Sequence, residues 1–433
     1  MKIIRTWDAD FDDNFRSLIM RNLWWERDVE RIVSRILENV YSKGDKALFY
    51  YAKKYDKSNV SPSSILVSEA EIHRAYYSVL KEEIDALKFA AKRIERFHKR
   101  DIPKSWFFKE NGIRLGKVVQ PLERVGLYVP GGKAAYPSTV LMNAIPAIVA
   151  GVKDIIITTP PYKEGVNHFV LVAADILGIN KIYKIGGAQA IAAMTYGTET
   201  IPKVDKIVGP GNIYVATAKR MVHSHVGIDM VAGPTELLIV ADESIHPSFV
   251  AMDLLSQAEH DERAIPVLVC FSAGYGNRVK NYITSFLKKL NRKEIAEVSI
   301  RNNGMIIIAR NIEEVARIVN SFAPEHLELC CKNSESLLRM VRNAGAIFIG
   351  SYTPEAVGDY IAGPNHVLPT GGTARFASPL SVEDFLKKSN VVFFTRRKLK
   401  MFRNKINRIA SMEGLDAHTG SVDIRIESAG DKG

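Results

Sequence analysis

Short runs of Val, Ile and other apolar residues constrain the fold of this chain more than any other feature of its sequence. From about Leu122 onward, these runs alternate with segments whose apolar residues have helical spacing. A run that is apolar at consecutive positions is typical of a strand buried on both faces, as in a parallel sheet covered by helices. The runs are RVGLYVP, DIIITTPP, KIYKIGG, KIVGPG, ELLIVADE, PVLVCFS, GMIIIAR and AIFIGSY.

The strands are too many for one mononucleotide-binding sheet, and the length of 433 residues also indicates more than one domain. The sequence therefore predicts an α/β fold with two Rossmann-like, incomplete parallel-sheet domains and helical appendages at both termini. Candidate domain boundaries lie at 129–132 (VPGG) and 232–236 (AGPTE). The expected parts are an N-terminal appendage (1–25), a discontinuous first domain (26–127 and 237–380), a second domain (128–236) and a helical tail (381–433).

The chain before the first of these strands is typical of helices. Residues 28–44 have helix-spaced apolar side chains and end on Lys43-Gly44, a plausible C-cap. A second helix opens at the capping box Ser68-x-x-Glu71 and is expected to run on as one long helix to about residue 100. We find no internal repeat and no low-complexity segment.

The net charge of +11 makes nucleic-acid binding an alternative from another functional class. The basic residues gather in 90–104 and 396–408, but there they alternate with apolar residues at helical spacing. This pattern is typical of the solvated face of an amphipathic helix. The sequence has no RNP-like aromatic motif, zinc finger or basic tail, so we expect no nucleic-acid partner.

Cysteine content and hydropathy indicate a cytoplasmic protein. Cys270, Cys330 and Cys331 lie in strand-like apolar runs, as expected of buried thiols in a reducing compartment. No CxxC occurs, which argues against a zinc ribbon or a dithiol redox centre. The N-terminus has acidic residues where a signal peptide has its apolar core, and no apolar run approaches the ~18 residues of a membrane span.

Glycine-rich turns follow several predicted strands: YVPGGKAAYPS, IGGAQAIAA, GPGNIYVATA and LPTGGTARFAS. Such turns can hold phosphates at helix N-termini, although none matches the GxGxxG motif of dinucleotide-binding sheets. Tyr128, Gln189 and Asn212 stand beside three of the turns. An aromatic ring and two amides suit an adenine- or ribose-binding wall, and they suit ordinary hydrogen bonds within loops equally well.

Polar side chains that could carry chemistry are concentrated in four segments of the second half. They are Gln257, Glu259 and His260 in SQAEH, Glu325 and His326 in FAPEHLEL, Asp359 and His366 in AVGDYIAGPNHVLPTGG, and Glu413, Asp416 and His418 in MEGLDAHTGS. Histidine with carboxylate is the usual ligand set of an enzymatic zinc site, and an adjacent Glu-His pair suits proton transfer. Because the segments lie far apart in the sequence, spacing alone leaves a metal site and ordinary solvated polar residues both open.

Seven longer motifs occur in a fixed order along the chain. They are VGLYVPGGKAAYPSTVLMNAIPAIVAG, IGGAQAIAAMTYGTE, VDKIVGPGNIYVATAKR, IDMVAGPTELLIVAD, DLLSQAEH, SFAPEHLEL and GDYIAGPNHVLPTGGTARFASPLSV. In that order they resemble the motifs of the histidinol dehydrogenase family, from about Gly126 to beyond Gly414.

The resemblance implies a role for each polar segment. It implies a zinc site, with one Zn²⁺ per subunit, formed by Gln257, His260, Asp359 and His418. The implied acid–base pair is Glu325 and His326. The implied substrate contacts are these zinc ligands together with His326, Thr235, His366 and Glu413, and the implied NAD contacts are Tyr128, Gln189 and Asn212. Thr235 stands where many members of the family have serine, but the hydroxyl group is kept.

The implied reaction is the four-electron oxidation of L-histidinol to L-histidine through the aldehyde, using two NAD in turn. The resemblance also implies a homodimer in which the segment from Ser381 onward supplies Glu413 and His418 to the partner. A related zinc and NAD dehydrogenase of another small alcohol, such as a sulfonated diol, is the nearest alternative, although the carboxylate of Glu413 suits an amine better than an anion. A zinc hydrolase is a further alternative that leaves the glycine turns without a role.

Overall fold

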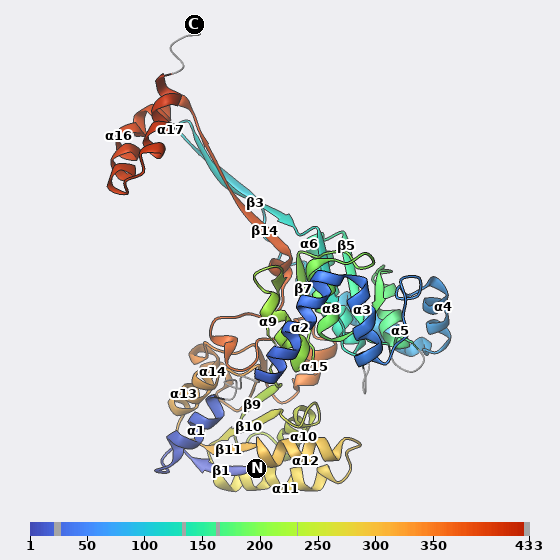
Figure 1. Cartoon of the computed structure of the whole chain (residues 1–433). Coiled ribbons are helices and arrows are strands. Elements are labelled where there is room, and N and C mark those ends of the chain that lie inside the picture. Colours follow the sequence, from blue (N-terminus) through green and yellow to red (C-terminus); the bar gives the residue numbers. More distant parts are fainter. Residues whose placement is uncertain (21–26, 132–135, 162–164, 232, 428–433) are drawn as a thin grey trace. The chain divides into compact units, whose positions relative to one another are not determined.

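The computed structural model describes residues 1–20, 27–131, 136–161, 165–231 and 233–427. They form two compact units, one of Met1–Asp101 with Leu122–Phe385 and one of Ile102–Pro121 with Leu386–Gly433 (Figure 1). Two residues of the predicted domain boundaries, Gly132 and Ala232, lie outside the described residues. The last residues of the predicted N-terminal appendage and of the tail also lie outside them. The predicted domain boundaries stay a prediction.

A parallel five-stranded sheet in the first unit has the order β6-β5-β4-β7-β8. Its strands are β4 (Arg124–Tyr128), β5 (Asp154–Thr159), β6 (Ile182–Lys184), β7 (Lys206–Val208) and β8 (Gly227–Ile228). Its crossover helices are α6 (Pro137–Ala150), α7 (His168–Ile176), α8 (Gly187–Tyr196) and α9 (Ile213–Val222). Because all five strands are parallel, the turns after β6, β4 and β7 lie at one edge of the sheet.

A parallel six-stranded sheet in the same unit has the order β1-β11-β10-β9-β12-β13. Its strands are β1 (Lys2–Arg5), β9 (Glu236–Ala241), β10 (Ile265–Cys270), β11 (Met305–Ile308), β12 (His326–Cys330) and β13 (Ala346–Ile349). Its helices are α1 (Phe11–Ile19), α10 (Pro247–Ala258), α11 (Ala273–Leu287), α12 (Lys293–Asn302), α13 (Ile312–Phe322), α14 (Ser334–Met340) and α15 (Glu355–Tyr360). Short 3₁₀ turns follow at Thr373–Arg375 and Val382–Phe385.

The six-stranded sheet is buried on both faces, as continuous apolarity predicts. Leu237 and Ile239 of β9 pack in a core with α10, α11 and α12, whereas Leu238 and Val240 pack in a core with α1, α13 and α14. Successive side chains of a strand point to opposite faces, so each face requires its own apolar residues. The predicted α/β fold with two parallel sheets is therefore confirmed, and the three cysteines are buried and free.

Helices also form most of the N-terminal segment: α2 (Arg27–Lys43), α3 (Asp45–Tyr51), a π-helix (Ala52–Asp56), α4 (Glu69–Tyr77) and α5 (Lys81–His98). The predicted capping box is present, because the Glu71 N–H donates to Ser68 Oγ at 3.3 Å and the Ser68 N–H donates to Glu71 at 2.9 Å. The prediction of one long helix after it was wrong. The helix stops at Tyr77, and α5 begins anew where Glu83 accepts from the Leu80 N–H at 2.8 Å.

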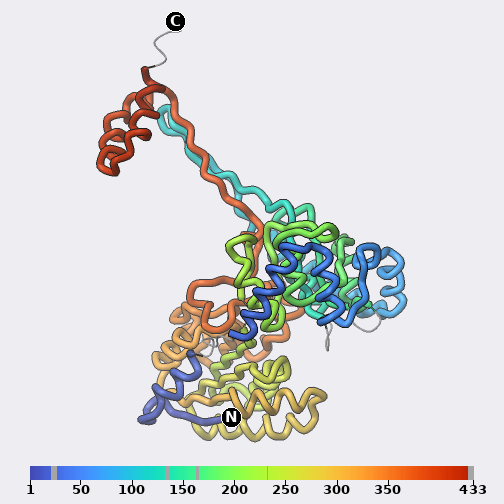
Figure 2. The backbone as a smooth tube through the Cα atoms, in the orientation of Figure 1, coloured from blue at the N-terminus to red at the C-terminus, as the bar shows by residue number. Residues whose placement is uncertain are grey.

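These N-terminal helices pack on helices of the five-stranded sheet. Helix α2 contacts α8 and α9, α4 contacts α7, and α5 contacts α6. Figure 2 shows this blue segment beside the green segment that carries the sheet. The packing brings the end of the π-helix to the turn after β6, where the Gly186 N–H donates to Asp56 at 3.0 Å.

The second unit combines a three-stranded antiparallel sheet with two helices. The strands are β2 (Trp106–Glu110), β3 (Ile113–Pro121) and β14 (Leu386–Phe394), in the order β14-β3-β2, and the helices are α16 (Arg396–Met412) and α17 (Asp416–Glu427). Arg403 joins the two helices through an ion pair with Asp423 at 2.7 Å. Two helices thus follow residue 395 in the described part of the tail, but strand β14, which the sequence pattern did not indicate, precedes them. No helix among the described residues is long and apolar enough to cross a membrane.

Candidate active site

The polar side chains predicted in the six-stranded sheet meet at the amino ends of β9 and β12. These two strands are neighbours, with His326 of β12 in register with Leu237 of β9. Glu325, just before β12, accepts hydrogen bonds from the Thr235 hydroxyl at 2.8 Å and from the Glu236 N–H at 2.9 Å. Burial, together with the negative charge of Glu236, raises the pKa of Glu325 well above its usual value.

His326 is buried and its tautomer follows from its hydrogen bond. Its Nδ1 lies 3.0 Å from the carbonyl oxygen of Glu236, and because a carbonyl only accepts, Nδ1 carries the proton. The other nitrogen, Nε2, therefore has a free lone pair, and it faces Glu355 at 3.6 Å and Asp359 at 3.9 Å. Burial lowers the pKa of His326 to about 3, so the ring is neutral at physiological pH.

Gln257 connects these strands with α15. One orientation of its carboxamide satisfies both ends, since the nitrogen then donates to the two Glu355 oxygens at 2.7 and 2.6 Å and the oxygen accepts from the Glu236 N–H at 2.9 Å. In the opposite orientation, the amide oxygen faces two carboxylate oxygens with no donor between them. That arrangement requires a proton or a cation.

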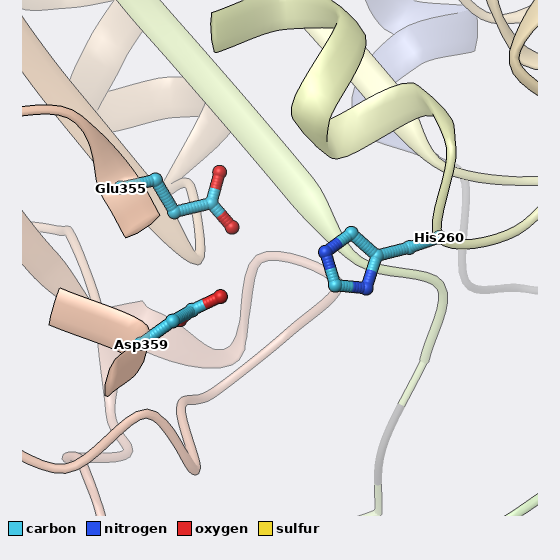
Figure 3. Close-up of side chains that lie close together, drawn as sticks. All are labelled: His260, Glu355 and Asp359. Atoms are coloured by element: carbon cyan, nitrogen blue, oxygen red, sulfur yellow. The ribbon is translucent and has the colours of Figure 1, made fainter. Parts of the chain in front are cut away.

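Three side chains, those of His260, Glu355 and Asp359, converge on one space (Figure 3), and Gln257 contacts one of them, Glu355. His260 approaches from the segment after α10, and Glu355 and Asp359 approach from α15, where a spacing of four residues puts both carboxylates on one face of the helix. One ligand atom of each lies within 4.8 Å of the others. A nitrogen and two carboxylate oxygens form a donor set suited to a divalent metal such as zinc.

The electrostatics of this group also favour a cation. Burial raises the pKa of Asp359 to about 6, and burial with the nearby charge of Asp359 raises the pKa of Glu355 well above its usual value. A bound cation would offset the cost of burying these negative charges. His366 lies against the same helix, with its Nδ1 3.0 Å from the Asp359 carbonyl oxygen, and burial lowers its pKa to about 4.

The three predicted NAD contacts lie at the carboxyl edge of the five-stranded sheet. Tyr128 ends β4, and its hydroxyl oxygen accepts from the Gly187 N–H at 3.1 Å. Gln189, in α8 after β6, donates to Asp56 at 3.2 Å. Asn212, after β7, caps α9 by accepting from the N–H groups of the second and third residues that follow it, at 3.1 and 3.2 Å. The turns thus present helix N-termini at this edge, the arrangement that binds phosphates.

Comparison with known proteins agrees with the motifs that carry this geometry. The family model described as histidinol dehydrogenase matches residues 20–426. The chain belongs to the histidinol dehydrogenase family. A histidinol dehydrogenase from Geobacter metallireducens is 49% identical over 433 residues, which cover 100% of this chain and 99% of the relative. One from Clostridium acetobutylicum is 50% identical over 429 residues, 99% of each chain.

A solved structure supports the same assignment. The crystal structure of histidinol dehydrogenase from Elizabethkingia anophelis superposes with a TM-score of 0.92 at 38% identity, and the match covers 99% of this chain and 98% of that one. Membership of the histidinol dehydrogenase family makes this chain an oxidoreductase that acts on a CH–OH group and takes part in histidine biosynthesis.

The structure brings together most, but not all, of the predicted zinc and substrate residues. Gln257, Asp359, Thr235, His366 and the Glu325–His326 pair share contacts in the first unit, and His260 lies within reach of Asp359. Glu413 and His418 belong to the second unit, where both are exposed, at the end of α16 and in the first turn of α17.

Sequence reasoning missed two acidic residues that the structure places at these sites. Glu355 completes the group of His260 and Asp359, and Asp56 binds both Gln189 and the Gly186 N–H. A signal for Glu355 was present, since it precedes Asp359 by four residues after a proline, a pattern typical of a helix start. Asp56 had no comparable signal, because its partner turn lies 130 residues further along the chain.

Proposed function

We propose that this chain oxidises L-histidinol to L-histidine through L-histidinal, in a four-electron reaction that uses two NAD in turn and one zinc ion per subunit. One observation carries the proposal. His326 is a buried, neutral histidine whose Nε2 is free to accept a proton, and it lies beside both a carboxylate pair suited to a metal and a third carboxyl group, that of Glu325.

The zinc ligands would be Gln257, His260, Asp359 and His418. The orientations open to the Gln257 carboxamide support this, because its oxygen can face Glu355 only when a proton or cation lies between them. When bound, zinc would hold the imidazole and amine of the substrate and so orient the alcohol carbon. Glu355 lies close enough to Gln257 and Asp359 to hold both ligands in place or to act as a further metal ligand itself.

His326 would be the base of both oxidations. The carbonyl group of Glu236 holds Nδ1–H, so the ring can take the alcohol proton only at Nε2. A proton accepted there would face the carboxyl oxygens of Glu355 and Asp359, which lie 3.6 and 3.9 Å from Nε2. The same nitrogen would accept the proton of the hydrated aldehyde in the second step.

Glu325 would activate the water that hydrates the aldehyde. Its two hydrogen bonds from Thr235 and Glu236 fix one carboxyl oxygen and leave the other for water. A raised pKa makes a deprotonated Glu325 a stronger base than an exposed carboxylate. Thr235, His366 and Glu413 would contact the substrate, with the carboxylate of Glu413 pairing with its ammonium group.

NAD would bind at the carboxyl edge of the five-stranded sheet and accept the hydride from the substrate. Tyr128, Gln189 and Asn212 would contact it there, beside the N-termini of α8 and α9. Burial raises the pKa of Tyr128 to about 12, so its hydroxyl group stays protonated and can donate to a ligand.

Two chains would share each active site. Glu413 and His418 lie in the tail, and we propose that a homodimer exchanges this tail so that each subunit completes the site of the other. Size-exclusion chromatography with activity measured across the eluted fractions tests this. Activity in a fraction that contains only monomer would contradict it.

The deciding experiment measures the yield of NADH per L-histidinol consumed, with zinc-loaded protein and excess NAD. We expect close to two NADH, histidine as product, and loss of activity on chelation. His326→Asn should lower kcat by about 10² to 10⁴, the usual contribution of a general base. His73→Asn, at an exposed position of α4, is the matched control and should leave kcat unchanged. No NADH from folded, zinc-loaded protein would mean that the substrate is a different small alcohol.

A further inference from the structure

Two further acidic side chains lie close to the proposed metal site, Glu328 fully buried and Asp253 partly exposed. Glu328 is two residues after His326 on β12, so both side chains point to the same face of the strand. Its side chain is completely buried, on a strand that is paired on both sides in a parallel sheet. An ionisable group in such a place loses its hydration, so its contacts must compensate for that loss.

The first contact of Glu328 is with the start of α15. Its Oε1 accepts from the Glu355 N–H at 2.8 Å. Pro354, at the N-cap position, has no side chain that can accept a hydrogen bond from this helix. The first N–H groups of a helix have no partner within it, so Glu328 provides from β12 the cap that the helix itself lacks. The capped helix carries both Glu355 and Asp359.

The second contact of Glu328 is with α10. Asp253 precedes Gln257 by four residues, so both project from the same face of that helix. The carboxyl groups of Asp253 and Glu328 lie close together, and Oε2 of Glu328 has no hydrogen-bond partner among the described residues while both groups are ionised. A proton held by either carboxyl group would join the two through a hydrogen bond. Burial raises the pKa of Asp253 to about 6, while burial and the charge of Asp253 raise the pKa of Glu328 well above its usual value.

We propose that Glu328 and Asp253 are positioning residues that fix α10 and α15 against the strand bearing His326, and thereby set the separation between the zinc ligands Gln257 and Asp359. The inference rests on the proposed function for the identity of those ligands. A pair of apolar side chains of similar volume would fill the same space without the cost of desolvation. It could not cap α15 or bind α10 to it.

The test is the zinc affinity of full-length variants, measured by competition with a chromogenic chelator. Glu328→Leu removes both contacts and should weaken zinc binding by about 10- to 100-fold, the usual effect of losing a residue that holds a metal ligand in place. Glu328→Gln should keep zinc affinity within about threefold, because its amide oxygen still accepts from the Glu355 N–H and its nitrogen donates to Asp253.

A second pair of variants covers the case in which Glu328→Leu fails to fold. Asp253→Leu should weaken zinc binding in the same direction, whereas Asp253→Asn should not. Glu314→Leu is the matched control, because Glu314 is also a buried glutamate, and it accepts from the Arg310 N–H at 2.9 Å and from Thr6 beside α13. It should lower the unfolding midpoint and leave zinc affinity unchanged.

Two results would overturn the inference. One is a zinc affinity of Glu328→Leu or Asp253→Leu equal to that of Glu314→Leu. The other is a loss in Glu328→Gln as large as in Glu328→Leu, which would show that the proton of Glu328, and not its hydrogen bonds, is required. Absence of zinc binding by the unmodified chain would overturn both the proposed metal site and this inference. Zinc binding without histidinol oxidation would overturn the proposed substrate alone.

Discussion

A buried ion pair holds the turn beside the proposed NAD site, and breaking it gives the sharpest test of how this sheet is stabilised. Lys219 of α9 and Asp229 are paired, with side chains only 2% and 1% exposed. Lys219 also donates to the Gly209 carbonyl oxygen at 2.9 Å, and Asp229 accepts from the Gly209 N–H at 2.8 Å. The pair therefore fastens the turn that leads to Asn212.

Lys219→Met should be strongly destabilising because it leaves the charge of Asp229 buried without a partner. Removing one member of a buried pair costs about 3–5 kcal/mol. At about 2–4 °C per kcal/mol for a domain of this size, the unfolding midpoint should fall by roughly 6–20 °C. Lys219→Met with Asp229→Leu should recover part of the loss, since no buried charge remains. The recovery is incomplete because Gly209 has still lost two hydrogen bonds, each contributing about 1 kcal/mol.

Thermal unfolding of the single and double variants measures these effects, and the KM for NAD reports on the turn. Lys181→Met is the matched control, because Lys181 pairs with Asp154 in the same sheet but its side chain is 48% exposed. An exposed pair contributes only about 0–1 kcal/mol. A midpoint for Lys219→Met that equals that of the control, or a double variant less stable than the single one, would refute the reasoning.

Three further predictions follow from single residues. Burial lowers the pKa of His98, so as pH falls below about 6.5 the unfolded chain binds a proton more readily than the folded chain, and the free energy of unfolding falls. His98→Phe removes this group. The free energy of unfolding of the variant minus that of the parent, measured by urea unfolding, should therefore be larger at pH 5 than at pH 7.5. Asn212→Ala should lower the unfolding free energy by about 1 kcal/mol through loss of the α9 cap and should raise the KM for NAD. Glu355→Ala should weaken zinc binding by about tenfold or more in a chelator competition assay, because it removes one of the two carboxyl groups that face the proposed zinc site.

The two parallel sheets were predictable because a strand that is buried on both faces appears in the sequence as a continuous apolar run. The five residues of β9 after Glu236 each enter one of two cores, so all five had to be apolar, and the run LLIVA records this. The strands of the second unit are not visible as continuous apolar runs. In β14 no residue is fully buried, so LKKSNVVFF mixes charged and apolar residues without a clear period. The four residues of β1 are too few to establish a period.

Of the candidate site, sequence predicted the residue types better than their contacts. The pair Glu325-His326 is visible because its members are adjacent, and Gln257 with His260 because both lie at one helix end. Glu355 was missed although it lies in the same helix as Asp359, since a lone glutamate near a helix start is ordinarily solvated. Only the pairing of β12 with its neighbours shows that this helix start is buried and capped by Glu328.

The two proposed ligand sites lie at opposite kinds of sheet edge, and helix polarity gives a physical reason. At the carboxyl edge of the five-stranded sheet, the N-termini of α8 and α9 present partial positive charge, which suits the phosphates of a dinucleotide. At the amino ends of β9 and β12, α10 ends just before His260 and presents partial negative charge, which suits a cation. Helix α15 begins at the same place, but the carboxyl group of Glu328 occupies its first N–H and so weakens the opposing field. A strand–glycine–helix motif in a sequence therefore indicates a candidate anion site. By the same reasoning, a helix–polar–strand motif such as SQAEHDERAIPV indicates a candidate cation site.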